Sequence, residues 1–164
     1  MNRPERNIFA HHDHQDCRSG ALSAARQACE DKGLRLTPIR SRVLEILLES
    51  HKALGAYDIL ARLRAEGLGD KPPVAYRALD FLVANGFAHR LEKLNAFSAC
   101  ASHHDGHDPA FLICETCRRV AEIPLGPLEG ALDGAAADMG FAVSARMVEI
   151  TGLCPDCRDE AAHV

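Results

Sequence analysis

The sequence predicts an α+β protein in two parts: an N-terminal half of amphipathic helices and a smaller C-terminal α/β domain. Apolar residues recur at helical spacing up to about residue 86, and short strand-like runs follow from residue 87. The charge divides at nearly the same place. Residues 1–93 carry 15 Lys and Arg against 12 Asp and Glu, whereas residues 94–164 carry 4 against 11. A weakly basic part joined to an acidic part indicates two domains with different partners.

The helical part is predicted from apolar periodicity and from helix-capping residues. Residues 1–19 are polar and aperiodic, which predicts a flexible arm, and residues 20–94 form the first domain. Its first helix ends near Gly33, and its second begins with Thr37 as N-cap and Pro38 at the first helical position. The residues expected to face the core are Leu22, Ala25 and Cys29, then Ile39, Val43, Ile46 and Leu47, then Ile59, Leu60 and Leu63, and finally Ala75, Ala78, Leu79 and Leu82.

A β-hairpin is predicted to follow the helices, with strands at about 87–91 and 96–100 around the turn "EKLN". Three or four short helices followed by such a hairpin are typical of a winged helix-turn-helix. Residues 95–110 form the connection, and residues 111–164 form the α/β domain. Its predicted elements are the strands "AFLIC" and "RVAEI", a helix "PLEGALDGAAADM" with Leu128, Leu132 and Ala135 facing inward, and a long strand "FAVSARMVEI".

Composition and the chain start argue against a membrane or secreted protein. No segment approaches the ~18 uninterrupted apolar residues of a membrane span. The first residues, "MNRPERNIFAHHDHQDC", place charges and histidines where a signal peptide has an apolar run. A cytoplasmic location is therefore expected. There, paired cysteines indicate metal or redox chemistry more often than disulfides.

Two CxxC pairs predict a metal site. "CETC" lies on the turn between two predicted strands, and "CPDC" follows the last predicted strand. Two such turns complete a tetrahedral Zn–S₄ site with no open position, which is typical of structural zinc. A thiol redox motif is the alternative interpretation, and a zinc deaminase is disfavoured because no His-x-Glu precedes the pair. The four predicted ligands of this structural zinc are Cys114, Cys117, Cys154 and Cys157.

Further histidines, cysteines and acids have no assignment from spacing alone. His89, Cys100, His107 and Glu122 each have an ordinary interpretation as a surface, buried or loop residue. The N-terminal arm also holds a small group of potential ligands. A disordered arm with incidental ligands is favoured over a further metal site, because no partner ligand is evident for His11, His12, His14 and Cys17.

Six segments carry a resemblance to a known family. They are "LTPIRSRVLEIL", "AYDILARLR", "KPPVAYRALDFLVANGFAHRLE", "AFSAC", "FLICETCRRVAE" and "GLCPDC". Together they cover roughly residues 22–157 and resemble the ferric uptake regulator family, within it the zinc uptake branch. The sequence departs from the family pattern at two positions. One is Ala75, just before Tyr76, and the other is Gly55, a position where relatives tend to carry a hydroxyl residue. His103 and His104 are close enough to substitute for His107.

The resemblance implies two zinc ions per subunit. One is the structural zinc of the four cysteines, and the other occupies a regulatory site formed by His89, Cys100, His107 and Glu122. A set of two imidazoles, one thiolate and one carboxylate suits Zn²⁺, whereas sets without sulfur lean towards Mn²⁺ or Fe²⁺. Four protein ligands again leave no open position, which favours sensing over catalysis.

The resemblance also implies a repressor that binds palindromic operator DNA as a homodimer, with no enzymatic activity and no small-molecule substrate. In the fourth helix, the face opposite the core leaves Tyr76, Arg77 and Asp80 exposed. Arg77 is the candidate for reading a purine edge, and Tyr76 for a thymine methyl or a phosphate. A surface ion pair between Arg77 and Asp80 is the alternative. The candidates for positioning the DNA backbone are Tyr57, Arg40 and Lys71.

Three other interpretations remain open from sequence. The same fold could sense iron, manganese, nickel or peroxide. The CxxC pairs could belong to a zinc enzyme or a thiol oxidoreductase, which requires an open coordination position or a reactive thiol of low pKa. A DNA-binding protein with structural zinc alone would bind DNA regardless of mild chelation.

Overall fold

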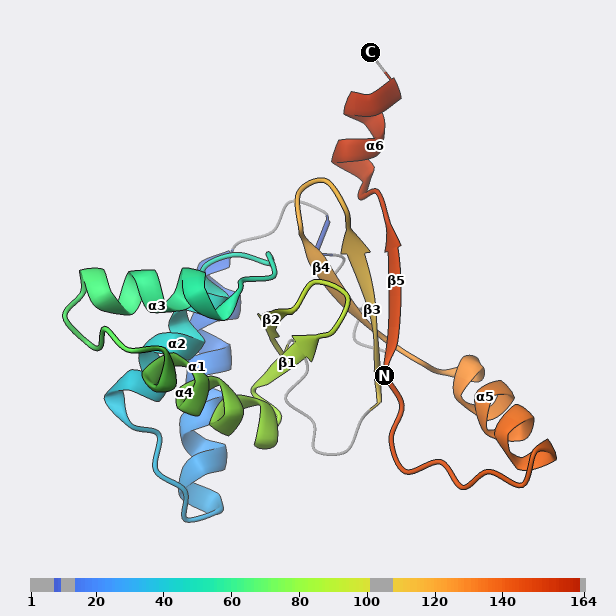
Figure 1. Ribbon diagram of the computed structural model, residues 1–164, viewed down its shortest axis with the longest axis horizontal. Helices are drawn as coiled ribbons and strands as arrows, with labels where there is room; N and C mark the ends of the chain where they lie inside the picture. The colour runs from blue at the N-terminus through green and yellow to red at the C-terminus, as the bar shows by residue number, and fades with distance from the viewer. Residues whose placement is uncertain (1–7, 10–13, 101–107, 163–164) are drawn as a thin grey trace.

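Helices form the N-terminal part of the chain, as expected (Figure 1). The structure is a computed structural model that describes residues 8–9, 14–100 and 108–162. Because polar residues can extend a helix whose later turns are packed, the first helix starts inside the segment predicted as an arm. The helices are α1 (His14–Asp31), α2 (Pro38–Leu48), α3 (Ala56–Ala65) and α4 (Pro72–Ala84).

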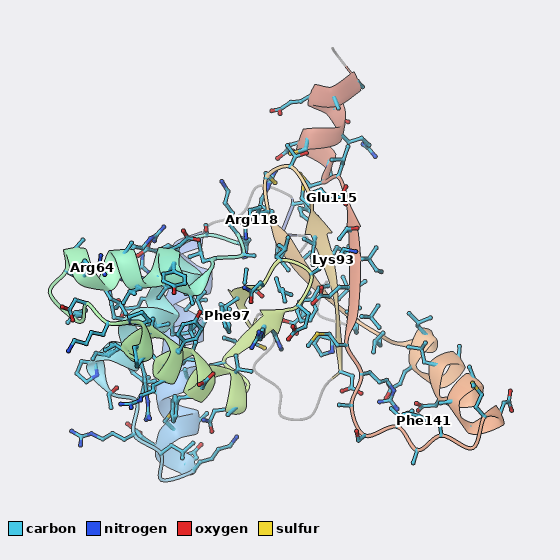
Figure 2. The ribbon with its side chains drawn as sticks, in the orientation of Figure 1. Arg64, Lys93, Phe97, Glu115, Arg118 and Phe141 are labelled. Carbon is cyan, nitrogen blue, oxygen red and sulfur yellow. The ribbon has the colours of Figure 1, made fainter. Side chains whose placement is uncertain are left out.

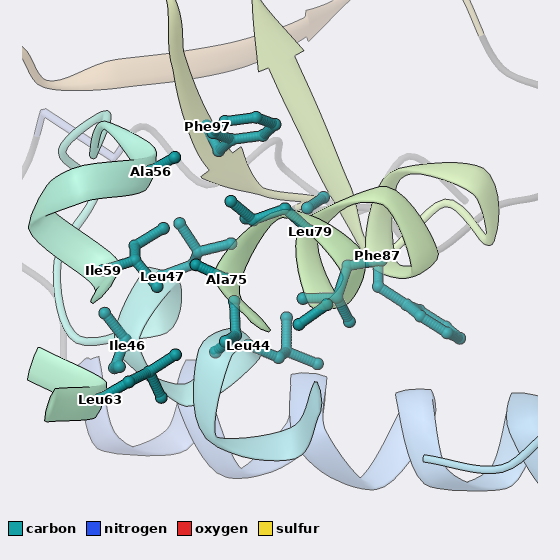
Figure 3. Close-up of a cluster of buried hydrophobic side chains, with 14 of the residues drawn as sticks. Leu44, Ile46, Leu47, Ala56, Ile59, Leu63, Ala75, Leu79, Phe87 and Phe97 are labelled. Carbon is teal, nitrogen blue, oxygen red and sulfur yellow. The ribbon is translucent and has the colours of Figure 1, made fainter. Parts of the chain in front are cut away.

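The helical core contains nearly all of the residues predicted from periodicity (Figure 3). The side-chain oxygen of Thr37 accepts a hydrogen bond from the backbone N–H of Arg40 at 3.4 Å, which confirms the predicted N-cap of α2. Ile39 is only partly buried, and Leu44, which was not among the predicted core residues, is buried. Cys29 is 2% exposed, so it is a core residue as expected.

A two-stranded wing follows the helices, as predicted. β1 (Ala88–Leu91) and β2 (Ala96–Ala99) are antiparallel, with His89 opposite Ser98. Asn95 closes the turn with a positive φ of 44°, a conformation that asparagine tolerates better than most residues. Helices followed by this hairpin confirm the winged helix-turn-helix.

The C-terminal part is a three-stranded sheet with two helices that extend away from it (Figure 1). The strand order is β4-β3-β5, with β3 antiparallel to β4 and parallel to β5. The mixed helix and sheet content confirms the predicted α+β class. The elements are β3 (Pro109–Cys114), β4 (Val120–Pro124), α5 (Pro127–Asp138), β5 (Val148–Gly152) and α6 (Pro155–Ala162).

Two predictions about this part were wrong. The strand predicted over 141–150 begins only at Val148, because residues 141–147 run without a neighbouring strand in the described part of the chain. The guanidinium of Arg146 instead binds the carboxylates of Asp133 and Asp108. The helix face predicted to be inward is also exposed, with Leu128 at 44% and Leu132 at 38%, and Ala135 is exposed as well. No other described element of the same chain covers that face.

The two parts meet along the α2–α3 connection and the wing. The backbone N–H of Ala53 donates to the carbonyl of Arg118 at 2.9 Å, and the N–H of Val120 donates to the carbonyl of His51 at 2.8 Å. Figure 2 shows Arg118 at the hairpin between β3 and β4, beside this connection. An apolar cluster drawn from both parts fills the junction: Ala53, Leu91, Ala96, Phe111, Ile113 and Val120.

No helix within the described residues is long and apolar enough to cross a membrane.

Candidate metal centres

Four cysteine side chains converge at one end of the sheet. Their sulfur atoms all lie within 4.8 Å of one another. The parallel pairing of β3 with β5 sets Cys114 opposite Gly152, so the turn after β3 and the turn after β5 become neighbours. Each CxxC turn is closed by the same type of backbone bond, from Arg118 N–H to Cys114 and from Arg158 N–H to Cys154. The four sulfurs brought together are those of Cys114, Cys117, Cys154 and Cys157, as the spacing predicted.

The cysteine pKa values in this group differ because their hydrogen bonds differ. Burial raises the pKa of Cys114, but hydrogen bonds from the backbone N–H groups of Cys117, Cys154 and Thr116 outweigh it and lower that pKa to about 6. Burial and contacts with the other thiols raise the pKa of Cys157 to about 12. The lowered pKa of Cys114 favours its thiolate form, which is the form that binds a cation.

Arg119 links the two CxxC turns and was not foreseen from sequence. Its guanidinium donates to the sulfurs of Cys117 and Cys154, each at 3.3 Å, and to the carboxylate of Asp156. Cys117 belongs to the first turn, whereas Cys154 and Asp156 belong to the second. A cation on two sulfurs offsets part of the negative charge that four thiolates would bring together.

A second group of potential ligands lies where the wing meets the sheet. One ligand atom each of His89, Cys100 and Glu122 lies within 4.8 Å of the others. Nε2 of His89 is 3.4 Å from a carboxylate oxygen of Glu122, and these side chains are only 17% and 7% exposed. The ring of Phe111 packs 5.0 Å from the imidazole, centre to centre. His107, the fourth predicted ligand, lies outside the described residues, as do His103 and His104.

The local folding of two hairpins explains how these ligands meet. His89 is on β1, and Cys100 directly follows β2, held there by a 3.0 Å bond from its N–H to the carbonyl of Phe87. Glu122 is on β4, opposite Phe111 on β3. The group therefore combines two ligands of the wing with one of the sheet. Imidazole, thiolate and carboxylate together form a donor set suited to zinc.

The DNA-contact candidates lie on the helical part, at the positions that periodicity left outside the core. Tyr57 on α3 is 69% exposed and Tyr76 on α4 is 42% exposed. Arg77 and Lys71 are also exposed, and the described residues show no ion pair between Arg77 and Asp80. Arg40 differs from the other candidates because its guanidinium stacks over the ring of Phe81 at 3.7 Å and donates to the carbonyl of Arg35.

Comparison with known proteins agrees with this geometry. The family model described as the ferric uptake regulator family matches residues 31–151. The chain belongs to the ferric uptake regulator family. The zinc uptake regulation protein of Escherichia coli (strain K12) is 38% identical to it over 137 residues, which cover 83% of this chain and 80% of that protein.

Solved structures similar to this ferric uptake regulator family member include a zinc uptake regulator complexed with zinc and DNA. It superimposes with a TM-score of 0.84 at 36% identity, covering 88% of this chain and 97% of that one. XcZur in its holo form gives a TM-score of 0.75 at 41% identity, covering 87% and 99% of the two chains. The apo form of XcZur, at 40% identity and the same coverage, gives only 0.50.

Family membership excludes one of the interpretations left open by the sequence, that of an enzyme. The chain is a regulator and not an enzyme, so the CxxC pairs are not the centre of a zinc enzyme or of a thiol oxidoreductase.

Proposed function

We propose that this chain is a zinc-responsive transcriptional repressor, which binds palindromic operator DNA as a homodimer when zinc occupies its regulatory site. It thereby controls genes of zinc uptake and homeostasis. The observation that carries the proposal is the shared ligand group, in which His89 and Cys100 of the wing face Glu122 of the sheet. An ion held there joins the two parts of the chain, so its presence changes their relative position.

The proposal assigns two zinc ions to each subunit. The structural ion is held by Cys114, Cys117, Cys154 and Cys157. The regulatory ion is held by His89, Cys100 and Glu122 together with His107. His107 lies seven positions after Cys100 in the sequence, and its assignment follows the resemblance to the zinc uptake branch. His103 or His104 is the alternative fourth ligand.

Zinc would act by selecting one arrangement of the two parts. Without the ion, the helical part and the sheet part would populate several relative arrangements, and few of them place two reading helices on one duplex. Raising the competent fraction from about 1% to about 99% requires ~5.5 kcal/mol of differential binding. A four-ligand zinc site binds with ~10 kcal/mol or more, which is sufficient. The closer superposition on the holo form than on the apo form of XcZur supports assigning the arrangement seen here to the zinc-bound state.

Residues 20–94 would read the operator, with α4 in the major groove. Arg77 contacts a purine edge and Tyr76 a thymine methyl or a phosphate. Tyr57 and Lys71 would position the backbone. The stacking of Arg40 on Phe81 supports a second task for this residue, which is to orient α4 while its remaining N–H groups face a phosphate.

Replacing Arg77 by alanine is expected to weaken operator binding by about 1–3 kcal/mol, because a bidentate contact to one base is lost. The discrimination at that base pair should fall as well. Fluorescence anisotropy with the operator and with single-base variants measures both effects at fixed salt. Arg158→Ala on α6 is the matched control, since it removes the same charge far from α4. Equal affinity of wild type and Arg77→Ala for every sequence would contradict the base contact.

Residues 111–164 would form the homodimer interface. The described residues of this part expose a series of large apolar side chains, from α5 through β5 to the last CxxC turn. An exposed apolar surface of this kind marks a protein interface. The residues are Leu128, Leu132, Met139, Phe141, Met147, Ile150 and Leu153.

Phe141→Asp is expected to convert the dimer into monomers at micromolar concentration. In a two-fold interface each substitution acts twice, and two carboxylates would be buried on association. Sedimentation velocity gives the mass directly. Tyr57→Asp is a matched control, because Tyr57 has the same 69% exposure but lies in the helical part. A Phe141→Asp protein that sediments as the wild-type dimer would remove this face from the proposal.

The function is tested by measuring operator affinity across buffered free zinc, using protein that holds only its tightly bound ion. A gain of about a hundredfold corresponds to ~2.7 kcal/mol of coupling between zinc and DNA. Equal affinity at every zinc level would overturn the proposal. Repeating the titration with iron, manganese and nickel then tests the alternative of another metal signal. As a regulator of operator DNA, the protein would act in the cytoplasm.

A further inference from the structure

The turn at the tip of the wing is held by a side chain of the sheet. The carboxylate of Glu149 on β5 accepts hydrogen bonds from two successive backbone N–H groups, those of Glu92 at 2.7 Å and Lys93 at 2.8 Å. Both oxygens are used, one for each N–H group. Figure 2 shows the labelled Lys93 where the wing meets the sheet. Hydrogen bonds from backbone N–H groups to a charged carboxylate are shorter and stronger than those between neutral groups.

An apolar contact supports the same position of the turn. Leu94, the next residue of the turn, packs against the cluster at the junction, which includes Phe111, Ile113 and Val120 of the sheet. The turn is closed on itself by a bond from Asn95 N–H to the carbonyl of Glu92 at 3.2 Å. The N–H groups of Glu92 and Lys93 are thus presented by an ordered turn rather than by a free loop.

The register of the sheet relates this contact to the second ligand group. Phe111 on β3 is paired with Glu122 on β4 and with Glu149 on β5. Residues directly opposite each other in neighbouring strands point to the same face of a sheet. The three side chains therefore form one row across the sheet, with Glu122 and Glu149 separated by two strand spacings, roughly 9–10 Å.

The wing strand β1 lies across this row. Its beginning, at His89, faces Glu122 and the ring of Phe111. The turn that follows its far end is bound by Glu149 through the N–H groups of Glu92 and Lys93. The junction cluster and the backbone bonds of Ala53 and Val120 already hold the two parts together. The contacts at His89 and at the wing turn add attachment points near both ends of β1, which restrict the angle of the wing to the sheet.

We propose that Glu149 is a positioning residue of the zinc switch: it clamps the wing turn to β5 and so presets the arrangement in which His89 and Glu122 share an ion. The inference rests on the proposed function. Glu149 belongs to neither ligand group, so its role would be to position the wing and not to bind the ion. Zinc and the clamp favour the same arrangement, here called closed, in which the wing lies against the sheet. Loss of the clamp lowers the fraction of molecules in the closed arrangement, and the apparent zinc affinity falls in proportion to that fraction.

This role has a signature that distinguishes it from a general contribution to stability. For Glu149→Ala, the free zinc needed for half-maximal operator binding should rise about tenfold. At saturating zinc the operator affinity should return to within about twofold of wild type, because zinc then closes the arrangement by itself. The zinc of the cysteine group should be retained. Glu149→Gln keeps one uncharged acceptor and should give an intermediate shift.

The experiment combines two measurements on full-length protein. The first is the zinc-buffered operator titration of wild type, Glu149→Ala and Glu149→Gln, with Glu160→Ala on α6 as the control for loss of an exposed carboxylate. The second is amide hydrogen exchange of Glu92 and Lys93, which reports the clamp directly. In Glu149→Ala these two amides should exchange at least about tenfold faster than in wild type.

The clamp is refuted if exchange at these amides is unchanged, or if the zinc midpoint of Glu149→Ala equals that of wild type. An equal loss of operator affinity at all zinc levels, saturating zinc included, would also refute it, since that result describes a merely structural residue. If wild type shows no zinc dependence, the proposed function fails. The amide exchange then decides alone whether Glu149 holds the wing.

Discussion

Replacing Cys100 by serine is expected to remove the zinc dependence of operator binding. The wild type should gain about a hundredfold or more in affinity as free zinc rises, ~2.7 kcal/mol of coupling, and the variant should gain almost nothing. The sulfur of Cys100 lies within 4.8 Å of the ligand atoms of His89 and Glu122. A serine hydroxyl is a poor replacement for thiolate as a zinc ligand. With His89 as the one strong ligand left on the wing, zinc should no longer bind tightly enough to stabilise the closed arrangement.

The measurement is the zinc-buffered operator titration, with Cys29→Ala as the control. Cys29 is also a buried thiol, at 2% exposure, but it lies in the helical core and outside both ligand groups. Cys29→Ala should therefore keep the full zinc response. His89→Ala should behave like Cys100→Ser, because it removes another ligand of the same ion. A Cys100→Ser protein with a normal response would exclude this thiol from sensing and favour a signal read by N and O ligands alone.

Cys157→Ser is expected to cause the largest loss of stability of any single change considered. The sheet part has little core of its own, because its helices α5 and α6 expose most of their side chains. Structural zinc sites contribute ~10 kcal/mol or more to folding, as much as the entire stability of an ordinary domain. Losing one of four thiolates should therefore release the ion and unfold the sheet part, while the helical part remains folded.

Native mass spectrometry counts the bound zinc, and circular dichroism follows unfolding. Wild type should retain one zinc per subunit after mild chelation, and Cys157→Ser should retain none. Cys100→Ser serves as the control, since its cysteine group is intact and its tightly bound zinc should remain. Strong chelation of wild type should reproduce the unfolding of Cys157→Ser. Full zinc retention and an unchanged midpoint of thermal unfolding in Cys157→Ser would show that the cysteine group is not what stabilises this part.

Local patterns were sufficient where each residue's environment depends on neighbours in sequence. The cap at Thr37 and the buried faces of α3 and α4 follow from side chains three and four residues apart, and the structure confirms them. The CxxC turns are equally local. Their meeting could be expected because two turns complete one four-coordinate site, and the sulfurs do converge.

Local patterns failed where an apolar face has no cover within the described residues of the chain, and where strands end. The apolar periodicity of α5 is real, but Leu128 and Leu132 face solvent in the single chain. Periodicity shows that a face is apolar, and it does not show what covers it. Residues 141–147 have a strand-like sequence, but a strand also requires a hydrogen-bonded neighbour, which the sequence does not display.

The sequence by itself determined the N-terminal helices, the wing that follows them, the helical core and the two CxxC turns, because short-range spacing carries that information, but it did not indicate α6 (Pro155–Ala162). The family resemblance named His89, Cys100 and Glu122 as ligands of one site, and the tertiary structure shows their ligand atoms within 4.8 Å of one another. Only the tertiary structure decided that Arg119 bridges both CxxC turns and that Glu149 binds the tip of the wing. Each of these contacts depends on strand register and on how two separately folded parts meet. Those relations join residues far apart in the chain, and no periodicity within one segment encodes them.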